Sequence, residues 1–482
     1  MGRGAAWMIA GRFAEKFLGL LSTFVLARLL LPEHFGIVMI ASSIVAALEL
    51  MGAFSFDTVL IQLQNATREH YDCVWTIGFF FNCFYALILS AGAWWFADFY
   101  NDQRLVLALL VIAATRLCVG LANIGVIDFR KNLQFSQDFF YSIAKKIVTI
   151  SATITAAFVF RDHRALLVGL VIGSVYGLIT SYTRHPFRPR FSLRRAGDIF
   201  HSASWLFVHN IIYFLNTRST DFLVAKLAGT QALGVFNLAN EVASAPLTEI
   251  AAPVNRAAMP AYAKLGQSPS ELVKVYQSTQ QATALLLLPA CVIIATIAPL
   301  FVATMLGPNW MQVAELMPIL ALAALPLALA NNTGVVLLAL GHSRQNALMS
   351  GIRAATLLLG LFLLTFRYGA MGAAYALLVS SLLFLPISYW MLGRYIDISL
   401  GSSLRACLRP ALASLPSGLL LGLVCSHWAP SLLHLIAALA LALGLYLLML
   451  ALLWLVAGRP DSHEKAVFLW AYRLLPKNRQ RA

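Results

Sequence analysis

The chain has 482 residues, of which 60% are hydrophobic and 11% are charged, and its formal net charge is +15. Soluble domains contain about 45–50% apolar and about 25% charged residues, so this composition excludes an ordinary soluble enzyme. Apolar runs close to the roughly 20 residues that cross a hydrocarbon core of about 30 Å recur along the whole length. We therefore predict an all-α polytopic membrane protein.

In chain order, the apolar windows predict about 14 transmembrane helices separated by short polar segments. These predicted spans are residues 6–31, 35–61, 74–97, 105–127, 139–160, 164–183, 199–223, 232–256, 281–306, 314–340, 345–366, 371–393, 406–428 and 432–457. The count is even, and most of the 35 lysines and arginines fall in segments on one side, which the positive-inside rule makes cytoplasmic. We expect a bacterial inner-membrane protein with both termini in the cytoplasm. Attraction to anionic lipids explains the positive charge, so no nucleic-acid partner is expected.

Two stretches of the chain repeat each other. ARLLLPEHFG at 27–36 returns as AKLAGTQALG at 225–234, an offset of 198, and Phe160-Arg161 returns as Phe366-Arg367, an offset of 206. Such a distance accommodates six spans, so the copies enter the membrane in the same direction, as in parallel-repeat transporters. We predict two six-helix lobes around a central cleft, plus two C-terminal helices. The predicted parts are an N-terminal lobe (1–183), a basic, hinge-like cytoplasmic linker (184–198), a C-terminal lobe (199–395), two additional helices (396–458) and a cytoplasmic interfacial tail (459–482).

Two local patterns add detail. Ser268-Pro269-Ser270-Glu271 is typical of a capping box with proline at the first helical position, and it predicts a short surface helix. Gly169, Gly173 and Gly177 in the sixth span, like Gly418 and Gly422 in the thirteenth, predict close helix packing.

Polar residues at membrane depth recur at helical spacing. In the first span Arg12, Lys16, Gly19 and Thr23 share one face, and similar stripes occur in the seventh and eighth spans. A single such residue is explained equally well by an interhelical hydrogen bond or an end charge, whereas the stripes together favour a lined cavity. Cationic, amide and hydroxyl groups suit a phosphate-bearing sugar ligand, and carboxylates suit a coupling proton or Na⁺. The candidate substrate-binding residues are Arg12, Lys16, Thr23, Arg116, Tyr213, Asn216, Arg218, Asn237 and Asn240. The candidate ion-coupling residues are Glu49, Asp57, Asp221, Glu241 and Glu249.

Enzyme motifs are missing from the sequence. It contains no GxxxxGK[ST] phosphate loop, HExxH, GxSxG or DxD. We therefore expect no enzymatic activity, no catalytic residues, no cofactor and no metal site.

Three stretches carry a family resemblance: AAWMIAGRFAEKFLGLLSTFVLARLLLPEHFGIVMIA, DFRKNLQFSQ and STDFLVAKLAGTQALGVFNLANEV. They resemble the Wzx-type polysaccharide flippases, especially the colanic-acid-like branch, of the multidrug, oligosaccharidyl-lipid and polysaccharide exporter superfamily. The resemblance implies a V-shaped cleft and flipping of an undecaprenyl-pyrophosphate-linked oligosaccharide from the inner to the outer leaflet for polysaccharide export. It also implies a cationic lumen for the pyrophosphate, to which Arg12, Lys16, Arg116 and Arg218 are assigned. The implied partners are the lipid-linked oligosaccharide, membrane lipids and, as further candidates, a polysaccharide polymerase and export components.

Two other functions compete with this interpretation. An ion-coupled multidrug antiporter of the same fold would favour acids over arginines in the cleft. A membrane-embedded glycosyltransferase or polymerase would need a sizeable outer loop or an acidic catalytic motif, and every predicted outer loop has only about a dozen residues or fewer. The enzyme alternative therefore ranks last.

Overall fold

The computed structural model describes residues 2–51, 60, 66–194, 196–197, 211, 214–266, 268–425 and 428–458, and over these ranges it contains helices and no strand. Eleven of the described helices are long and apolar enough to cross a membrane. The predicted all-α polytopic fold is therefore confirmed, whereas the count of fourteen spans stays a prediction. The predicted tail, most of the span 199–223, Asp57 and Tyr213 lie outside the described residues.

The chain divides into two compact units, Met1–Val235 and Phe236–Ala482. The boundary falls inside helix α10 (Ser219–Ala243) and not in the segment 184–198. The division of the chain into repeats at that segment stays a prediction.

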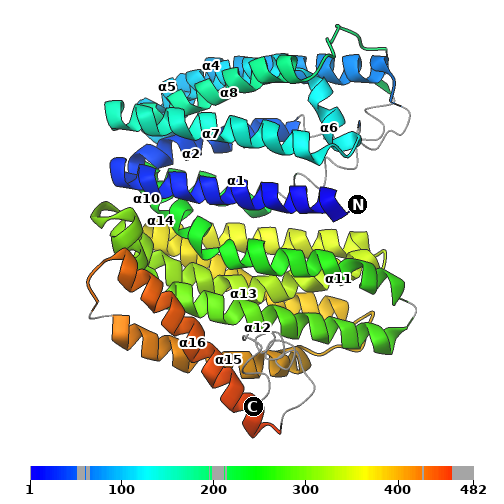
Figure 1. The fold of residues 1–482 in the computed structure, drawn as a ribbon, viewed down its shortest axis with the longest axis vertical. Coiled ribbons are helices and arrows are strands. Elements are labelled where there is room, and N and C mark those ends of the chain that lie inside the picture. Colours follow the sequence, from blue (N-terminus) through cyan, green and yellow to red (C-terminus); the bar gives the residue numbers. More distant parts are fainter. Residues whose placement is uncertain are drawn as a thin grey trace, which may run out of the picture. The chain divides into compact units, whose positions relative to one another are not determined.

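The first unit is built from long helices that pack in pairs. Helix α4 packs on α5, α7 on α8, α5 on α8 and α1 on α7, and their axes run nearly parallel (Figure 1). The elements of this unit are α1 (Gly2–Leu29), α2 (Pro32–Met51), α4 (Arg68–Tyr100), α5 (Arg104–Leu121), the 3₁₀ turn η1 (Ile124–Ile127), α6 (Asp128–Lys131), α7 (Phe135–Phe160) and α8 (Arg164–Arg184). The first helix is long, but Arg12, Glu15 and Lys16 interrupt its apolar run, and it is not among the eleven candidate spans.

The glycine row of α8 lies against α7. A Cβ at Gly169 would lie 1.7 Å from Thr153 Oγ1, and one at Gly173 would lie 2.1 Å from Thr149 Oγ1. These threonines share a face of α7 because they are four residues apart. The predicted close packing at this row is confirmed, since no larger side chain fits between the two helices.

The two copies of the repeated element pack against each other reciprocally. A Cβ at Gly36 would lie 1.8 Å from Thr230 O, and one at Gly234 would lie 2.0 Å from Pro32 O. Residues 32 and 230, like residues 36 and 234, are equivalent at the predicted offset of 198. Each copy therefore places its glycine on the backbone of the other copy, as expected of a pseudo-two-fold contact.

The segment 185–193 has no regular secondary structure, but it is held against the first unit. Asn123 Nδ2 donates to Phe187 O at 2.7 Å, Arg190 N donates to Asp72 Oδ1 at 2.8 Å, and Ser192 N donates to Thr76 Oγ1 at 3.0 Å. Polar side chains of α4 and of the turn after α5 thus bind the backbone groups of this segment, and its role as a hinge-like linker stays a prediction.

The second unit contains the remaining long helices. Within it α13 packs on α12 and α14, and α15 packs on α12 and α16. Its elements are the π-helix η2 (Leu247–Ala251), α11 (Ala252–Lys264), α12 (Pro269–Phe301), the π-helix η3 (Val302–Leu306), the 3₁₀ turn η4 (Pro308–Trp310), α13 (Met311–Ala339), α14 (Ser343–Leu392), α15 (Leu400–Cys425) and α16 (Leu432–Val456).

Helix α12 differs from the prediction. It begins at Pro269, as expected, but Ser268 makes no side-chain capping hydrogen bond, and the helix continues to Phe301. The predicted capping box and short surface helix are therefore wrong. The cause is that Leu272, Tyr276 and Gln280 are fully buried on one helical face and carry the helix into the following apolar span.

A helical hairpin occurs twice in the chain at a fixed offset. Helix α14 is interrupted at Gly369, whose φ of 56° matches that of Arg161 at 55° between α7 and α8. The hairpins share an offset of 208 residues (343 minus 135) at three landmarks: the starts Phe135 and Ser343, the left-handed residues Arg161 and Gly369, and the ends Arg184 and Leu392. This offset is two residues larger than the predicted 206.

Candidate functional site

A predicted substrate residue and a predicted coupling residue form one ion pair in the first unit. Arg116 Nη1 of α5 donates to Glu49 Oε1 of α2. The side chains are 23% and 48% exposed, and Arg116 Nε has no hydrogen-bond partner among the described residues. The guanidinium therefore keeps a donor available beside the carboxylate that neutralises it.

The polar stripe of α1 faces a lysine of α7. Thr23 Oγ1 donates to Gly19 O at 3.0 Å, and a Cβ at Gly19 would lie 3.8 Å from Lys146 Nζ. On the same stripe Arg12 is exposed and Lys16 is half-buried. The structure thus places Lys146 beside the predicted cations of α1.

Lys145 is a second cation that the sequence stripes did not identify. A Cβ at Gly177 of α8 would lie 3.1 Å from Lys145 Cε, and Lys145 lies within Coulombic range of Arg116. Both lysines lie inside α7 and within the predicted span 139–160, but neither is among the predicted site residues. Three helices of the first unit therefore carry a concentration of positive charge, with Glu49 as the described ion-pair partner of Arg116.

The predicted pair Arg218 and Asp221 is also brought together. Asp221 is 4% exposed, and its Oδ2 accepts hydrogen bonds from Ser43 Oγ at 2.8 Å and from Arg218 Nη1 at 3.4 Å. This arrangement ties α10 to α2 and satisfies a buried carboxylate. The predicted functional roles of both residues stay predictions.

The remaining predicted residues lie on or near α10. Asn216 and Asn240 are half-buried, as is Glu241. Asn237 is half-buried too, and its Nδ2 has no hydrogen-bond partner in the described part of the chain. Glu249 is exposed and accepts a hydrogen bond from Thr248 Oγ1 at 3.0 Å. The predicted central cleft between two lobes stays a prediction.

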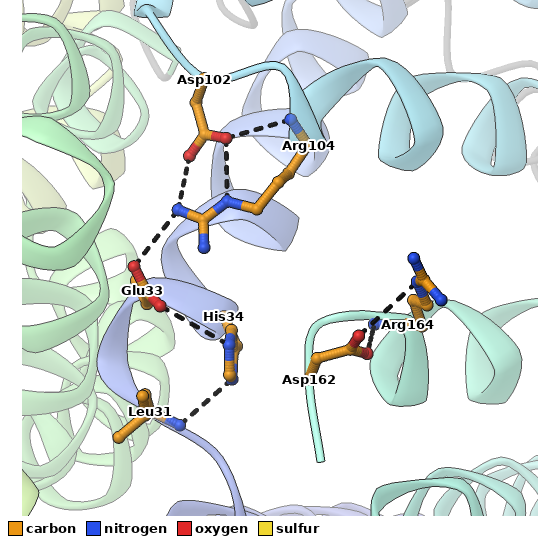
Figure 2. A network of polar contacts seen from close by, with 7 residues as sticks. All are labelled: Leu31, Glu33, His34, Asp102, Arg104, Asp162 and Arg164. Carbon is orange, nitrogen blue, oxygen red and sulfur yellow. Dashed lines mark hydrogen bonds and ion pairs between the residues drawn. The ribbon is translucent and has the colours of Figure 1, made fainter. Parts of the chain in front are cut away.

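A different polar network links two interhelical connections of the first unit, and a separate ion pair between Asp162 and Arg164 lies in a third (Figure 2). Arg104 at the start of α5 donates to Asp102 Oδ1 at 3.0 Å and to Glu33 Oε2 of α2 at 3.2 Å. Leu31 N donates to His34 Nδ1 at 3.3 Å. Burial alone would raise the pKa of Asp102, but the hydrogen bonds and the charge of Arg104 lower it overall. The carboxylate therefore stays charged and holds Arg104 in place.

His163, in the connection between α7 and α8, lies near this network. Its ring centroid lies 6.4 Å from that of His34, and its Nε2 is buried without a hydrogen-bond partner among the described residues. Burial lowers the pKa of His163, and the nearby cations Arg104 and Arg164 act in the same direction against Asp162. With its pKa below 6.5, the His163 imidazole is neutral at pH 7 and adds no charge beside Arg104.

Comparison with known proteins identifies the family. The profile of the family described as "Polysaccharide biosynthesis protein" matches residues 25–315, more than half of the chain. The chain belongs to this polysaccharide biosynthesis protein family.

Curated relatives of this family member come from several bacteria. The teichuronic acid biosynthesis protein TuaB of Bacillus subtilis (strain 168) is 22% identical over 372 residues, which cover 76% of each chain. The lipopolysaccharide biosynthesis protein WzxC of Escherichia coli (strain K12) is 22% identical over 351 residues, covering 70% of this chain and 69% of WzxC. The resemblance to polysaccharide exporters in the sequence is thereby confirmed.

Solved structures show the same fold. The lipid II flippase MurJ in an inward closed conformation superposes with a TM-score of 0.74 at 12% identity, covering 94% of this chain and 100% of MurJ. An inward-facing multidrug resistance transporter of the MATE family gives a TM-score of 0.58 at 13% identity, covering 80% of this chain and 96% of that transporter. At these identities the likeness shows the fold alone.

Proposed function

We propose that this polysaccharide biosynthesis family member is a flippase for an undecaprenyl-diphosphate-linked oligosaccharide, and that it moves this lipid from the inner to the outer leaflet by alternating access. The observation that carries the proposal is the cluster of Arg116, Lys145 and Lys146 inside membrane helices of a chain whose fold matches a lipid flippase. A charge at the bilayer centre costs about 2.5–3.5 kcal/mol on insertion scales, so retained cations mark a path for anions.

The ion pair suggests how binding and coupling are linked. Arg116 is the stronger candidate for a diphosphate oxygen because its planar fork of donors fits phosphate geometry. A diphosphate at Arg116 competes with Glu49 for the same donors. Glu49, which is 48% exposed, is then free to take up a proton or Na⁺. The assigned substrate and coupling roles of the other predicted residues belong to this same proposal.

Topology forms part of the proposal. Basic residues of the 184–194 segment, Arg184, Arg188, Arg190 and Arg194, are placed on the cytoplasmic side by the positive-inside rule. An even number of spans then puts both termini in the cytoplasm of the bacterial inner membrane. In this orientation α7 runs from the inner toward the outer leaflet.

Polymer export tests the proposal. In a bacterium that depends on this chain for export of a surface polysaccharide, Arg12→Ala combined with Arg218→Ala is expected to abolish polymer at the cell surface while the protein still inserts. Fractionation and quantification of membrane protein provide the insertion control. Normal export by the double variant would contradict the proposal.

A multidrug antiporter is the second candidate function, because a MATE transporter shares the fold over 80% of this chain. Cells that express the chain would then extrude cationic dyes under a cation gradient. Dye efflux together with unimpaired polymer export in a deletion strain would favour the antiporter. Polymer loss without dye efflux would favour the flippase.

A further inference from the structure

Lys145 carries its charge far from both ends of a membrane helix. It is followed by fifteen residues of α7, so it lies about 15 Å along the helix from Phe135 and about 22 Å from Phe160. Its ammonium group makes no ion pair or hydrogen bond with any residue that the structure describes. Such a charge is costly at this depth unless a ligand of opposite sign reaches it.

The surroundings of Lys145 are suited to an anion. Its side chain lies against Gly177, where the missing Cβ leaves room for the ammonium group at 3.2 Å. Tyr141 Oη and Thr180 Oγ1 both donate to Gly177 O at 3.3 Å, so two hydroxyls lie beside the same glycine. Arg116 adds a second positive charge within Coulombic range. The two hydroxyl hydrogens are used by backbone carbonyls, so the two cations are the groups that match a phosphate.

An apolar groove begins one helical turn beyond Lys145. It has a volume of about 560 Å³, lies between α7 and α8, and is open on one side. Val148, Ala152, Thr155 and Val159 of α7 line it, and their spacing of four, three and four continues the helical face on which Lys145 lies. A cation at one end of an apolar groove fits a ligand with a charged head and a hydrocarbon chain.

The second unit has a cation at the equivalent position. At the hairpin offset of 208 residues, Lys145 corresponds to Arg353 and Tyr176 corresponds to Phe384. The Arg353 guanidinium lies 5.8 Å from the Phe384 ring centroid and has no acidic partner among the described residues. Both hairpins thus carry, at the equivalent position, a cation without an acidic partner among the described residues, which argues against a chance surface charge.

We propose that Lys145 binds a phosphate of the lipid-linked substrate while the polyprenyl chain of that substrate lies in the groove between α7 and α8. This inference rests on the proposed function, and it names a residue and a groove for one part of the substrate. An ordinary phospholipid keeps its phosphate at the membrane surface. A hydrocarbon core of about 30 Å that ends at Phe160 would enclose Lys145, which lies about 22 Å from Phe160 along α7. A lipid in transit between leaflets brings a phosphate to this depth.

Binding to the purified full-length protein in nanodiscs tests the inference. The probe is undecaprenyl diphosphate, measured by native mass spectrometry in nanodiscs of neutral lipid. Lys145→Gln is expected to weaken binding at least tenfold, and Lys145→Arg is expected to retain it. Lys274→Gln, which removes the same charge from an exposed position of α12, is the matched control and is expected to bind like the wild type. Ala152→Phe fills the groove and is expected to weaken binding while Lys145 remains.

Three outcomes would overturn the inference. These are wild-type affinity in Lys145→Gln, equal affinity of Ala152→Phe and wild type, and displacement of the probe by an equimolar amount of phosphatidylglycerol. The thermal unfolding midpoint of each variant separates lost binding from lost folding, and Lys145→Arg provides a folded comparison. Polymer export in the deletion strain is measured separately. If export does not depend on the chain, the proposed function fails; if export depends on it and Lys145→Gln binds normally, only this inference fails.

Discussion

The reciprocal contact between the two copies of the repeated element gives a sharp test of the packing. In Gly36→Ala the new Cβ would lie 1.8 Å from Thr230 O and 2.6 Å from the Thr230 carbonyl carbon. Ordinary contact begins near 3.4 Å, so the two backbones would have to separate by about 1.6 Å (3.4 minus 1.8). Neither neighbour is a flexible side chain, and α2 cannot relax without moving its whole first turn.

Overpacking of this kind typically costs about 1–3 kcal/mol, and a backbone neighbour puts Gly36→Ala at the upper end of that range. We expect a clear fall in the midpoint of thermal unfolding in detergent, followed by circular dichroism. Gly78→Ala is the matched control, because a Cβ at Gly78 of α4 meets nothing within 4 Å. Alanine is the better helix former by about 1 kcal/mol, so this control should be neutral or slightly stabilised. Equal midpoints for the two variants would refute the close approach of the repeated elements.

Three further predictions concern polar contacts of the first unit. Glu49→Gln and Arg116→Gln should each lower the free energy of unfolding by no more than about 1 kcal/mol, because the ion pair is partly exposed. A double-mutant cycle should show a favourable coupling energy between the two side chains. Additive effects of the two substitutions would contradict the ion pair. The folded-state pKa of His163 lies below the ordinary 6.5, so the unfolded chain binds more protons near pH 6 and stability should fall as the pH drops below about 6.5. In His163→Gln the midpoint of thermal unfolding should decrease less as the pH drops. An unchanged pH dependence would contradict the role of His163. Asn123→Ala removes hydrogen bonds to three backbone carbonyls and should speed tryptic cleavage within 185–193. A cleavage rate equal to that of the wild type would show that other contacts hold this segment.

Much of the fold could be predicted from the sequence, because membrane-spanning helices are recognised by their length and hydropathy. The left-handed break at Gly369 falls between the predicted spans 345–366 and 371–393, where the apolar run is interrupted. The held segment 185–193 could not be predicted, since the side chains that bind it, such as Asp72 and Asn123, lie more than sixty positions away in sequence. Pairings over such distances depend on how helices pack and leave no local pattern.

The start of α12 shows a second limit. A proline-led capping pattern at Ser268 suggested a separate surface helix, because the apolar window begins only near residue 281. In the structure the helix is continuous, since no glycine or proline interrupts residues 270–288 and one amphipathic face is already buried. Local start signals therefore located the first residue of the helix and not its length.

The sequence predicted the type of site, which is cationic and lies within membrane helices, but it predicted only some of the residues that the structure brings together. Arg116 and Glu49 were predicted because they are charges at membrane depth, but their pairing follows from the packing of α2 on α5. Lys145 and Lys146 were not among the predicted site residues, although both lie within the predicted span 139–160. A signal was nevertheless present: fourteen residues of apolar or small polar character follow Lys146 before the next charge at Arg161. Two lysines at that position are already inside the membrane.

The charge balance of α7 connects stability with transport. An uncompensated cation at depth costs about 2.5–3.5 kcal/mol. A ligand at a concentration one hundred times its Kd stabilises the folded state by about 2.7 kcal/mol, which is close to the cost of one such charge. The proposed binding of a phosphate at Lys145 would therefore offset a penalty of this size. A carboxylate beside Lys145 would neutralise the lysine as Glu49 neutralises Arg116, and it would compete with the proposed substrate.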